Sequence, residues 1–138
     1  LPVREKVDGS QLAVDVTAVP DGRYRFVVVA SDAAVNPGEP RTGRRVSSWF
    51  DVDSTPPRVT LERQGDRWLV RVDDGDGVVA RARWARDGDE WVDLEPDDGV
   101  LDGARETFAF PAVAGRHLVV VSVSDRHFNR TTVSATED

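Results

Sequence analysis

Hydrophobic and polar residues alternate along most of this chain, as they do in strands that bury one face and expose the other. The spacing predicts three strands before residue 55. The residues that share one face of these strands are Leu12, Val14 and Val16 in QLAVDV; Tyr24, Phe26, Val28 and Ala30 in RYRFVVVA; and Val46, Ser48, Phe50 and Val52 in RVSSWFDV.

The alternation resumes after residue 57 and predicts a second set of strands. Their inward residues are Val59 and Leu61; Trp68, Val70 and Val72; Val78, Ala80, Ala82 and Trp84; and Phe108 and Phe110. Two more strands follow in RHLVVVSVSD and RTTVSA. Gly- and Asp-rich turn sequences separate the strands, and no stretch shows a helical stripe. The chain is therefore predicted to be all-β and built of antiparallel β-sandwiches.

Pro56 and Pro57 mark the predicted domain boundary. Proline has no amide proton and a fixed φ angle, so a strand ladder cannot continue through both residues. The pattern divides the chain into a first module at residues 1–53, a Pro-rich junction at residues 54–57 and a second module at residues 58–138.

The chain contains an internal repeat. Residues 22–36, GRYRFVVVASDAAVN, align without a gap to residues 115–129, GRHLVVVSVSDRHFN, with seven identities in fifteen positions. Each copy ends in a loop in which the Asp can accept backbone amides and the Asn tolerates the left-handed conformation. The loop residues with these structural roles are Asp32, Asn36, Asp125 and Asn129.

These residues resemble fibronectin type III and related bacterial immunoglobulin-like modules. VPDGRYRFVVVASD is similar to the corner before strand F and to strand F itself, where Tyr24 would form the tyrosine corner, and Trp84 is placed like the core Trp of strand C. VDSTPP resembles the junction that joins such modules in tandem. His117 departs from the pattern, because the second copy has no Tyr at this position.

The resemblance also implies a setting for the chain. DGDEWVDLEPDDGVLDGARETFAF, followed by the second repeat copy, is similar to C-terminal modules that come after β-propellers or other large domains in exported bacterial proteins. A secreted, periplasmic or cell-surface location is expected on this ground. The partner would be the rest of the parent chain or another protein.

The first module is predicted to be truncated. Residues 1–53 contain about four strand candidates, whereas an immunoglobulin-like sandwich needs about seven. Half a sandwich exposes an apolar sheet face and open strand edges. Three ways of covering that face stay open, namely upstream chain, self-association through residues 1–53 of an identical copy, and packing on the second module.

Composition removes several classes of function. The formal net charge of -7 disfavours nucleic acid, whose binding requires clustered cations. The absence of Cys excludes disulfides, thiolate zinc sites and Cys nucleophiles. No apolar run approaches the roughly 18 residues of a membrane helix, so no membrane insertion is expected.

Acidic turns offer oxygen ligands for calcium. The candidate metal ligands are Asp73, Asp74, Asp76, Asp87 and Asp89. Neither acidic stretch has the spacing of an EF-hand loop, and Asp-Gly pairs between strands form turns without any metal. Turn chemistry is therefore the preferred interpretation, and no cofactor is assigned.

No complete catalytic constellation is present, and the chain is not expected to be an enzyme. Ser124, Asp125 and His127 are close in sequence, but successive residues of a strand point to opposite faces, whereas a triad needs the imidazole between nucleophile and carboxylate. No catalytic residue is assigned.

Candidate ligand contacts come from two other observations. Trp49 and Trp91 lie at polar positions, where an exposed ring could stack on a sugar. Arg126, His127 and Phe128 replace the small residues of the first repeat copy. The expected function is a non-catalytic extracellular module that serves as spacer, adhesion or protein-docking region, and the alternative is a carbohydrate- or calcium-binding accessory module of an exported enzyme.

Overall fold

The computed structural model describes residues 11–138, and these residues form strands, loops and one short 3-10 helix without any α-helix. The chain divides into two compact units, Leu1–Val52 and Asp53–Asp138. The prediction of an all-β, antiparallel architecture is confirmed. None of the described helical segments is long and apolar enough to span a membrane.

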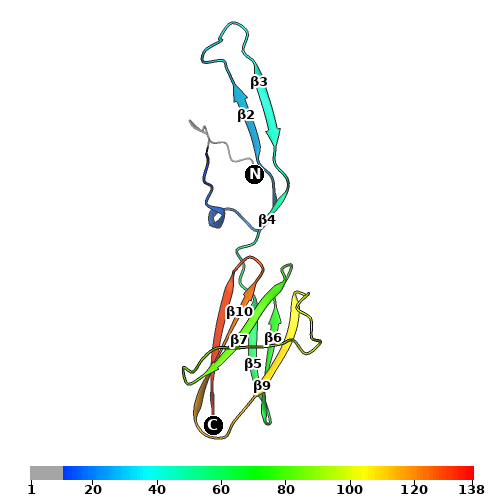
Figure 1. Cartoon of the computed structure of the whole chain (residues 1–138), viewed down its shortest axis with the longest axis vertical. Coiled ribbons are helices and arrows are strands. Elements are labelled where there is room, and N and C mark those ends of the chain that lie inside the picture. The colour runs from blue at the N-terminus through cyan, green and yellow to red at the C-terminus, as the bar shows by residue number, and fades with distance from the viewer. Residues whose placement is uncertain (1–10) are drawn as a thin grey trace. The chain divides into compact units, whose positions relative to one another are not determined.

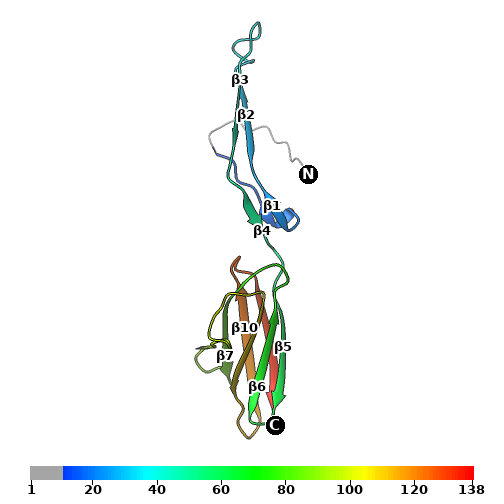
Figure 2. The ribbon, with the colours of Figure 1, turned by 90° about the vertical axis from the view of Figure 1, so that its right-hand side faces the viewer.

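The second unit contains two antiparallel sheets that face each other (Figures 1 and 2). One has the strand order β5-β6-β9 and the other β11-β10-β7-β8. The strands are β5 (Arg58–Gln64), β6 (Arg67–Asp73), β7 (Val79–Arg86), β8 (Val92–Asp93), β9 (Arg105–Pro111), β10 (His117–Asp125) and β11 (Arg130–Glu137). The two-residue strand β8 was not predicted from the alternation of residues.

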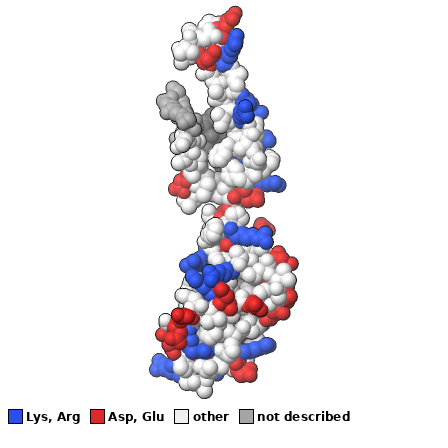
Figure 3. All heavy atoms as spheres, viewed as in Figure 1, with Lys and Arg blue, Asp and Glu red and all other residues white. Residues whose placement is uncertain are grey.

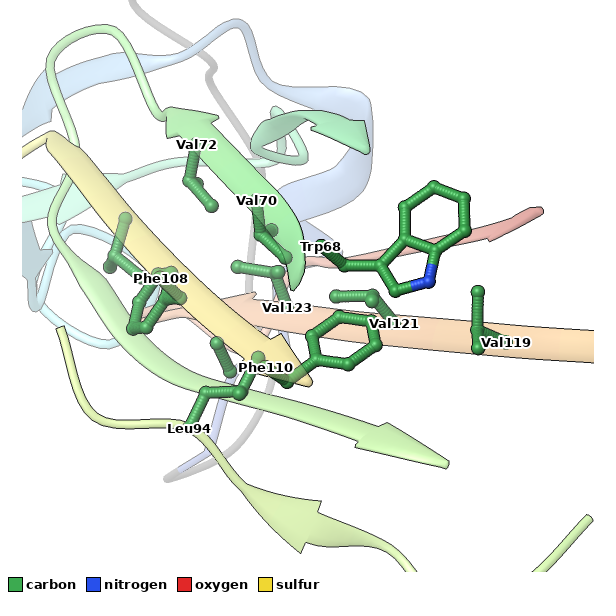
Figure 4. Packing of buried hydrophobic residues seen from close by; sticks show 11 residues of the cluster. Trp68, Val70, Val72, Leu94, Phe108, Phe110, Val119, Val121 and Val123 are labelled. Atoms are coloured by element: carbon green, nitrogen blue, oxygen red, sulfur yellow. The ribbon is translucent and has the colours of Figure 1, made fainter. Parts of the chain in front are cut away.

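The inner faces of the two sheets form one hydrophobic core. Figure 4 shows the side chains of β6 and β9 on one side and those of β10 on the other. Val70, Phe108 and Val121 are completely buried, and the Trp84 ring stacks on Phe110 with ring centroids 4.3 Å apart. The predicted inward residues of β5, β6 and β9 thus lie in this core or pack against it, because strand alternation sends every second side chain inward.

The predicted inward face of β7 is partly wrong. Val79 is fully buried and Ala80 is exposed, although the alternation placed Val78 and Ala80 inside. The register explains the error, since Ser124 pairs with Arg81 while Asp125 pairs with Val79. One residue of β7 therefore has no partner, and this β-bulge reverses the orientation of the side chains before it.

A buried ion pair lies at the carboxyl end of β11. Glu137 is fully buried and its carboxylate accepts hydrogen bonds from the Arg86 guanidinium at 2.9 Å and from the Trp68 indole at 2.5 Å. Burial raises the pKa of Glu137, but the bonds from Arg86 and Trp68 outweigh it, so the net pKa is lowered. The charge is therefore retained inside the sandwich, where an unpaired carboxylate would be costly.

The first unit contains two short strand pairs. β1 (Gly22–Tyr24) pairs with β4 (Phe50–Val52), and β2 (Val27–Ser31) pairs with β3 (Thr42–Val46). The single predicted strand over Val46–Val52 is thus broken, because the Ser47 side chain accepts the Phe26 amide at 2.8 Å where the ladder would continue.

Tyr24 makes the hydrogen bond that the resemblance implied. Its hydroxyl donates to the Pro20 carbonyl at 2.7 Å, four residues upstream. Its ring also packs near Phe50, with ring centroids 6.4 Å apart, and the Phe26 ring stacks on Phe50 at 4.9 Å. This small aromatic group holds the start of the hairpin together.

The predicted strand at Leu12–Val16 is wrong. Residues 11–15 form no strand, and residues Val16–Ala18 form the 3-10 helix. The Asp15 carboxylate accepts both the amide and the hydroxyl of Thr17. This local bond caps the helix and competes with an extended ladder, which an alternating pattern alone does not reveal.

The apolar residues of β2 are exposed. The exposed fractions are 44% for Phe26, 62% for Val28 and 63% for Val29. In the alignment of the two repeat copies, Phe26 and Val28 correspond to Val119 and Val121 of β10, which are completely buried. The same hairpin is therefore covered in the second unit and uncovered in the described part of the first.

Candidate functional site

The loop after β10 is organised by Asp125. This residue is 2% exposed, and its carboxylate accepts the backbone amides of His127 at 2.8 Å and Asn129 at 2.9 Å. The Asn129 side-chain amide donates to the same carboxylate and to the Asp53 carbonyl. The loop is thereby tied to the segment that leads into β5.

The first repeat copy uses its Asp in a similar way. The Asp32 carboxylate accepts the Arg41 amide across the hairpin loop, and the Asp32 carbonyl accepts the Asn36 amide at 2.8 Å. The Asn36 side chain donates to the Glu39 carbonyl at 2.7 Å. Both Asp residues therefore accept loop amides.

The two Asn residues act in their loops through hydrogen bonds and not through a left-handed backbone. Among the described residues, the only non-glycine residues with a positive φ are Asp87 and Phe128, so neither Asn adopts the left-handed conformation. Phe128 does so instead, with a φ of 66° and a side chain that is 91% exposed. Hydrogen bonding by Asn129 fixes the loop, and the left-handed residue lies one position earlier.

Three carboxylates come together in the second unit. Asp53 precedes β5, Asp74 follows β6 and Asp125 ends β10, and each offers an oxygen within 4.8 Å of the others. We call these three residues the carboxylate cluster. Antiparallel strands that end at the same edge of the sandwich bring together residues that are far apart in the sequence.

Asp74 is the unusual member of the carboxylate cluster. It is 9% exposed, and neither of its carboxylate oxygens has a hydrogen-bond partner among the described residues. Burial, together with the neighbouring charges of Asp125 and Asp53, raises the pKa of Asp74 to about 6, while His127 acts in the opposite direction. A buried carboxylate without donors is rare, because the loss of hydration is then uncompensated.

Gly77 has no side chain, and the Asp74 carboxylate lies in the space that a side chain would fill. A Cβ atom at this position would lie 2.0 Å from one Asp74 carboxylate oxygen and 3.2 Å from a carboxylate oxygen of Asp53. Any other residue would therefore displace the Asp74 side chain. The glycine is needed here for close approach and not for its φ angle.

Asp53 and His127 complete the surroundings of the cluster. One Asp53 oxygen accepts the Thr55 amide at 3.0 Å, and the other lies 3.3 Å from the His127 imidazole Nδ1. The side chains of Asp53 and His127 are 18% and 41% exposed. The cluster is thus reachable from solvent at its His127 side and holds only oxygen ligands plus one imidazole.

The other predicted metal candidates do not join Asp74. Asp73 accepts the Gly75 amide and lies 3.6 Å from Arg105, while Asp76 and Asp89 are exposed. Asp87 accepts a hydrogen bond from the Leu118 amide and lies 2.6 Å from His117. These four residues have turn or ion-pair roles in the structure.

The two Trp residues that were predicted as ligand contacts are both exposed, and each has an arginine guanidinium over its ring. Trp49 is 52% exposed, with the guanidinium of Arg25 4.8 Å from its ring centroid. Trp91 is 44% exposed, with the guanidinium of Arg83 at 4.9 Å. The Arg23 guanidinium also lies 5.9 Å from the Trp49 ring centroid, so arginine side chains already occupy part of the surface that each ring would offer for stacking.

No hydrogen bond or ion pair among the described residues joins the His127 imidazole to Ser124 or Asp125. Ser124 lies with Phe128 in an open groove, and the groove is also lined by Ala80, Arg81, Arg83, Ser122, Asp125 and Arg130. His127 lies against Asp53 instead. Arg126 is exposed and donates its amide to the Val78 carbonyl. Figure 3 shows acidic and basic side chains interspersed over the visible face of the second unit.

Sequence reasoning missed Asp53 as part of a site and assigned Asp125 a structural role only. Asp53 lies in the predicted junction, and 72 positions separate it from Asp125, so no spacing rule connects them. The repeat carried a partial signal, because it placed Asp125 at a strand end. Comparisons with protein-family models, with curated proteins and with solved structures found no match to this chain.

Proposed function

We propose that this chain is a non-catalytic pair of fibronectin type III-like modules that serves as a spacer and docking region of a larger exported bacterial protein. The strand order supports this type. In the second unit, the fourth strand β8 joins the sheet of β7, β10 and β11. A constant-type immunoglobulin sandwich instead has its fourth strand in the same sheet as its first, second and fifth strands.

The observation that carries the proposal is the different burial of the two repeat copies. Phe26 and Val28 are exposed, whereas the aligned Val119 and Val121 are fully buried by the other strands of their sandwich. β10 also pairs with β7 as well as β11, whereas β2 pairs only with β3 in the described residues. Within residues 11–52, the first unit thus has the face and the edge of a closing hairpin without the strands that would cover it.

The occupant that fits this face is the earlier part of the same module. In the second unit, residues 53–114 precede the repeat and supply the strands that cover it. Strands equivalent to β5, β6, β7 and β9 would cover the face of the first unit in the same way. A hairpin completed in this way would belong to a closed sandwich that is followed by the second unit. Two sandwiches in tandem are the arrangement that a spacer requires.

The test is hydrogen exchange on a longer protein that carries the natural sequence before Leu1. We expect the amides of β2 on the edge away from β3 to become protected, and the Val28 side chain to become buried. Protection of β2 that is the same in both proteins would contradict the proposal. A protein that becomes a dimer through this hairpin would contradict it as well, and light scattering detects that outcome.

The matched control is β10 in the same two samples. Its amides are already paired on both edges, so their protection should not change with the added sequence. A change at β10 would mean that the added residues act on the second unit and not on the hairpin of the first.

A further inference from the structure

The carboxylate cluster is the one group of side chains that the spacer role does not use. Several other turn aspartates accept backbone amides, as Asp73 accepts Gly75 and Asp125 accepts His127. The Asp74 side chain accepts none, although its turn is closed by its own carbonyl, which accepts the Gly77 amide at 3.0 Å. Turn chemistry therefore leaves the Asp74 carboxylate unexplained.

We propose that Asp53, Asp74 and Asp125 form a binding site for one calcium ion. Calcium takes six to eight oxygen ligands and accepts irregular geometry. Asp74 offers two unpartnered oxygens, and Asp53 and Asp125 each keep lone pairs beyond the hydrogen bonds they accept. Water would supply the remaining ligands at the solvent-facing side.

The burial of Asp74 is the independent observation that points to a cation. Three carboxylates whose oxygens lie within 4.8 Å of one another repel, and no described arginine forms an ion pair with any of them. A divalent ion at this position compensates the buried charge that no hydrogen bond compensates. Gly77 supports the same conclusion, since a larger residue would close the space in front of Asp74.

The chemistry of the ligand set favours calcium over other metals. Carboxylate oxygens are hard ligands that suit calcium, magnesium and manganese, whereas zinc and copper select nitrogen and sulfur. Magnesium demands nearly ideal octahedral geometry and gives up its water reluctantly. Ligands from three separate segments, two of them loops, fit the more tolerant ion.

A bound ion would tie three parts of the second unit together. These are the segment before β5, the loop after β6 and the loop after β10. Asn129 already links two of them through its bonds to Asp53 and Asp125. Calcium would therefore stabilise the second unit and fix the segment at residues 53–57, where the chain enters it.

The test is thermal unfolding of the whole chain after removal of metals with EDTA, in 10 mM calcium chloride, in 10 mM magnesium chloride and in sodium chloride of equal ionic strength. The buried Trp68 reports unfolding of the second unit by fluorescence. We expect calcium to raise the melting temperature by roughly 10 °C if its affinity is that of extracellular modules, and magnesium to raise it less.

Asp74→Asn is the decisive variant, and Asp76→Asn is its matched control in the same turn. Asp74→Asn should abolish the calcium shift, and in EDTA it should melt no lower than the original chain because it removes an uncompensated buried charge. Asp76 is exposed and outside the cluster, so Asp76→Asn should keep the full shift. Calorimetric titration should find one calcium per chain, and none for Asp74→Asn.

Three results would overturn the proposal. These are no calcium shift in the original chain, an equal shift in Asp74→Asn, and an equal or larger response to magnesium. The calcium site and the tandem arrangement are tested independently of each other. The carboxylate cluster lies wholly in the second unit, whereas the tandem arrangement is tested on β2 of the first.

Discussion

The side chain of Asp74 shows how a single residue can differ from its neighbours of the same type. Asp73 and Asp76 belong to the same turn sequence, yet only Asp74 is turned into the sandwich. The sequence predicted it as one of five equivalent acids, because turn composition does not reveal which carboxylate is buried. The residues that complete the cluster, Asp53 and Asp125, come from chain that tertiary structure alone brings near.

His117 occupies in the second repeat copy the position that Tyr24 has in the first. Its Nδ1 lies 2.6 Å from an Asp87 carboxylate oxygen, and Asp87 holds a φ of 52° in the turn after β7. The hydrogen bond with Asp87 raises the pKa of His117, and the same bond lowers the pKa of Asp87. The pair therefore joins the β7 turn to the start of β10.

The stability that this pair contributes should depend on pH. The interaction that raises the pKa of His117 stabilises the fold fully below the ordinary value of 6.5, and this effect is lost as the pH rises through the folded pKa. The interaction that lowers the pKa of Asp87 stabilises the fold above the ordinary value of 3.8, and this effect is lost as the pH falls through the folded pKa. Urea unfolding of the original chain and of His117→Gln should differ most near pH 5.5 and least near pH 9. A difference that grows with pH would contradict the assignment.

At the scale of elements, alternation predicted the strands of the second unit except the two-residue β8, and it failed where a side-chain bond or a bulge interrupts a ladder. Asp15 capping Thr17, Ser47 binding the Phe26 amide and the bulge in β7 are three such interruptions. Each depends on a side chain or a register that period-2 spacing does not encode. The turns were predicted well, because Asp-Gly sequences favour positive φ, as at Asp87 and Gly88.

Two phenylalanines of equivalent pattern should respond differently to truncation. Phe108 is completely buried, so Phe108→Ala should destabilise the second unit by about 3–5 kcal/mol. Phe26 is 44% exposed, so Phe26→Ala should cost clearly less in this chain. Urea unfolding followed by circular dichroism measures both. Equal costs would mean that the first hairpin is covered in solution.

At the scale of the whole molecule, the repeat is more informative than the alternation of residues. The alternation identifies strands, but the aligned copies show which face of a hairpin a sandwich covers. The predicted junction at residues 54–57 lies just after the division between Val52 and Asp53. How the first unit is completed could not be deduced from pattern, because burial depends on strands from elsewhere as much as on the hairpin itself.

The most direct test of this account is residue-resolved amide hydrogen exchange by NMR on the chain itself. β2 and β10 are the same strand in the two repeat copies, and only β10 lies in a closed sandwich. We expect the amides of Val119–Val123 to exchange only through global unfolding of the second unit, and those of Val27–Ser31 to exchange at least roughly a hundredfold faster. Equal protection of the two strands would contradict the claim that the first hairpin is uncovered.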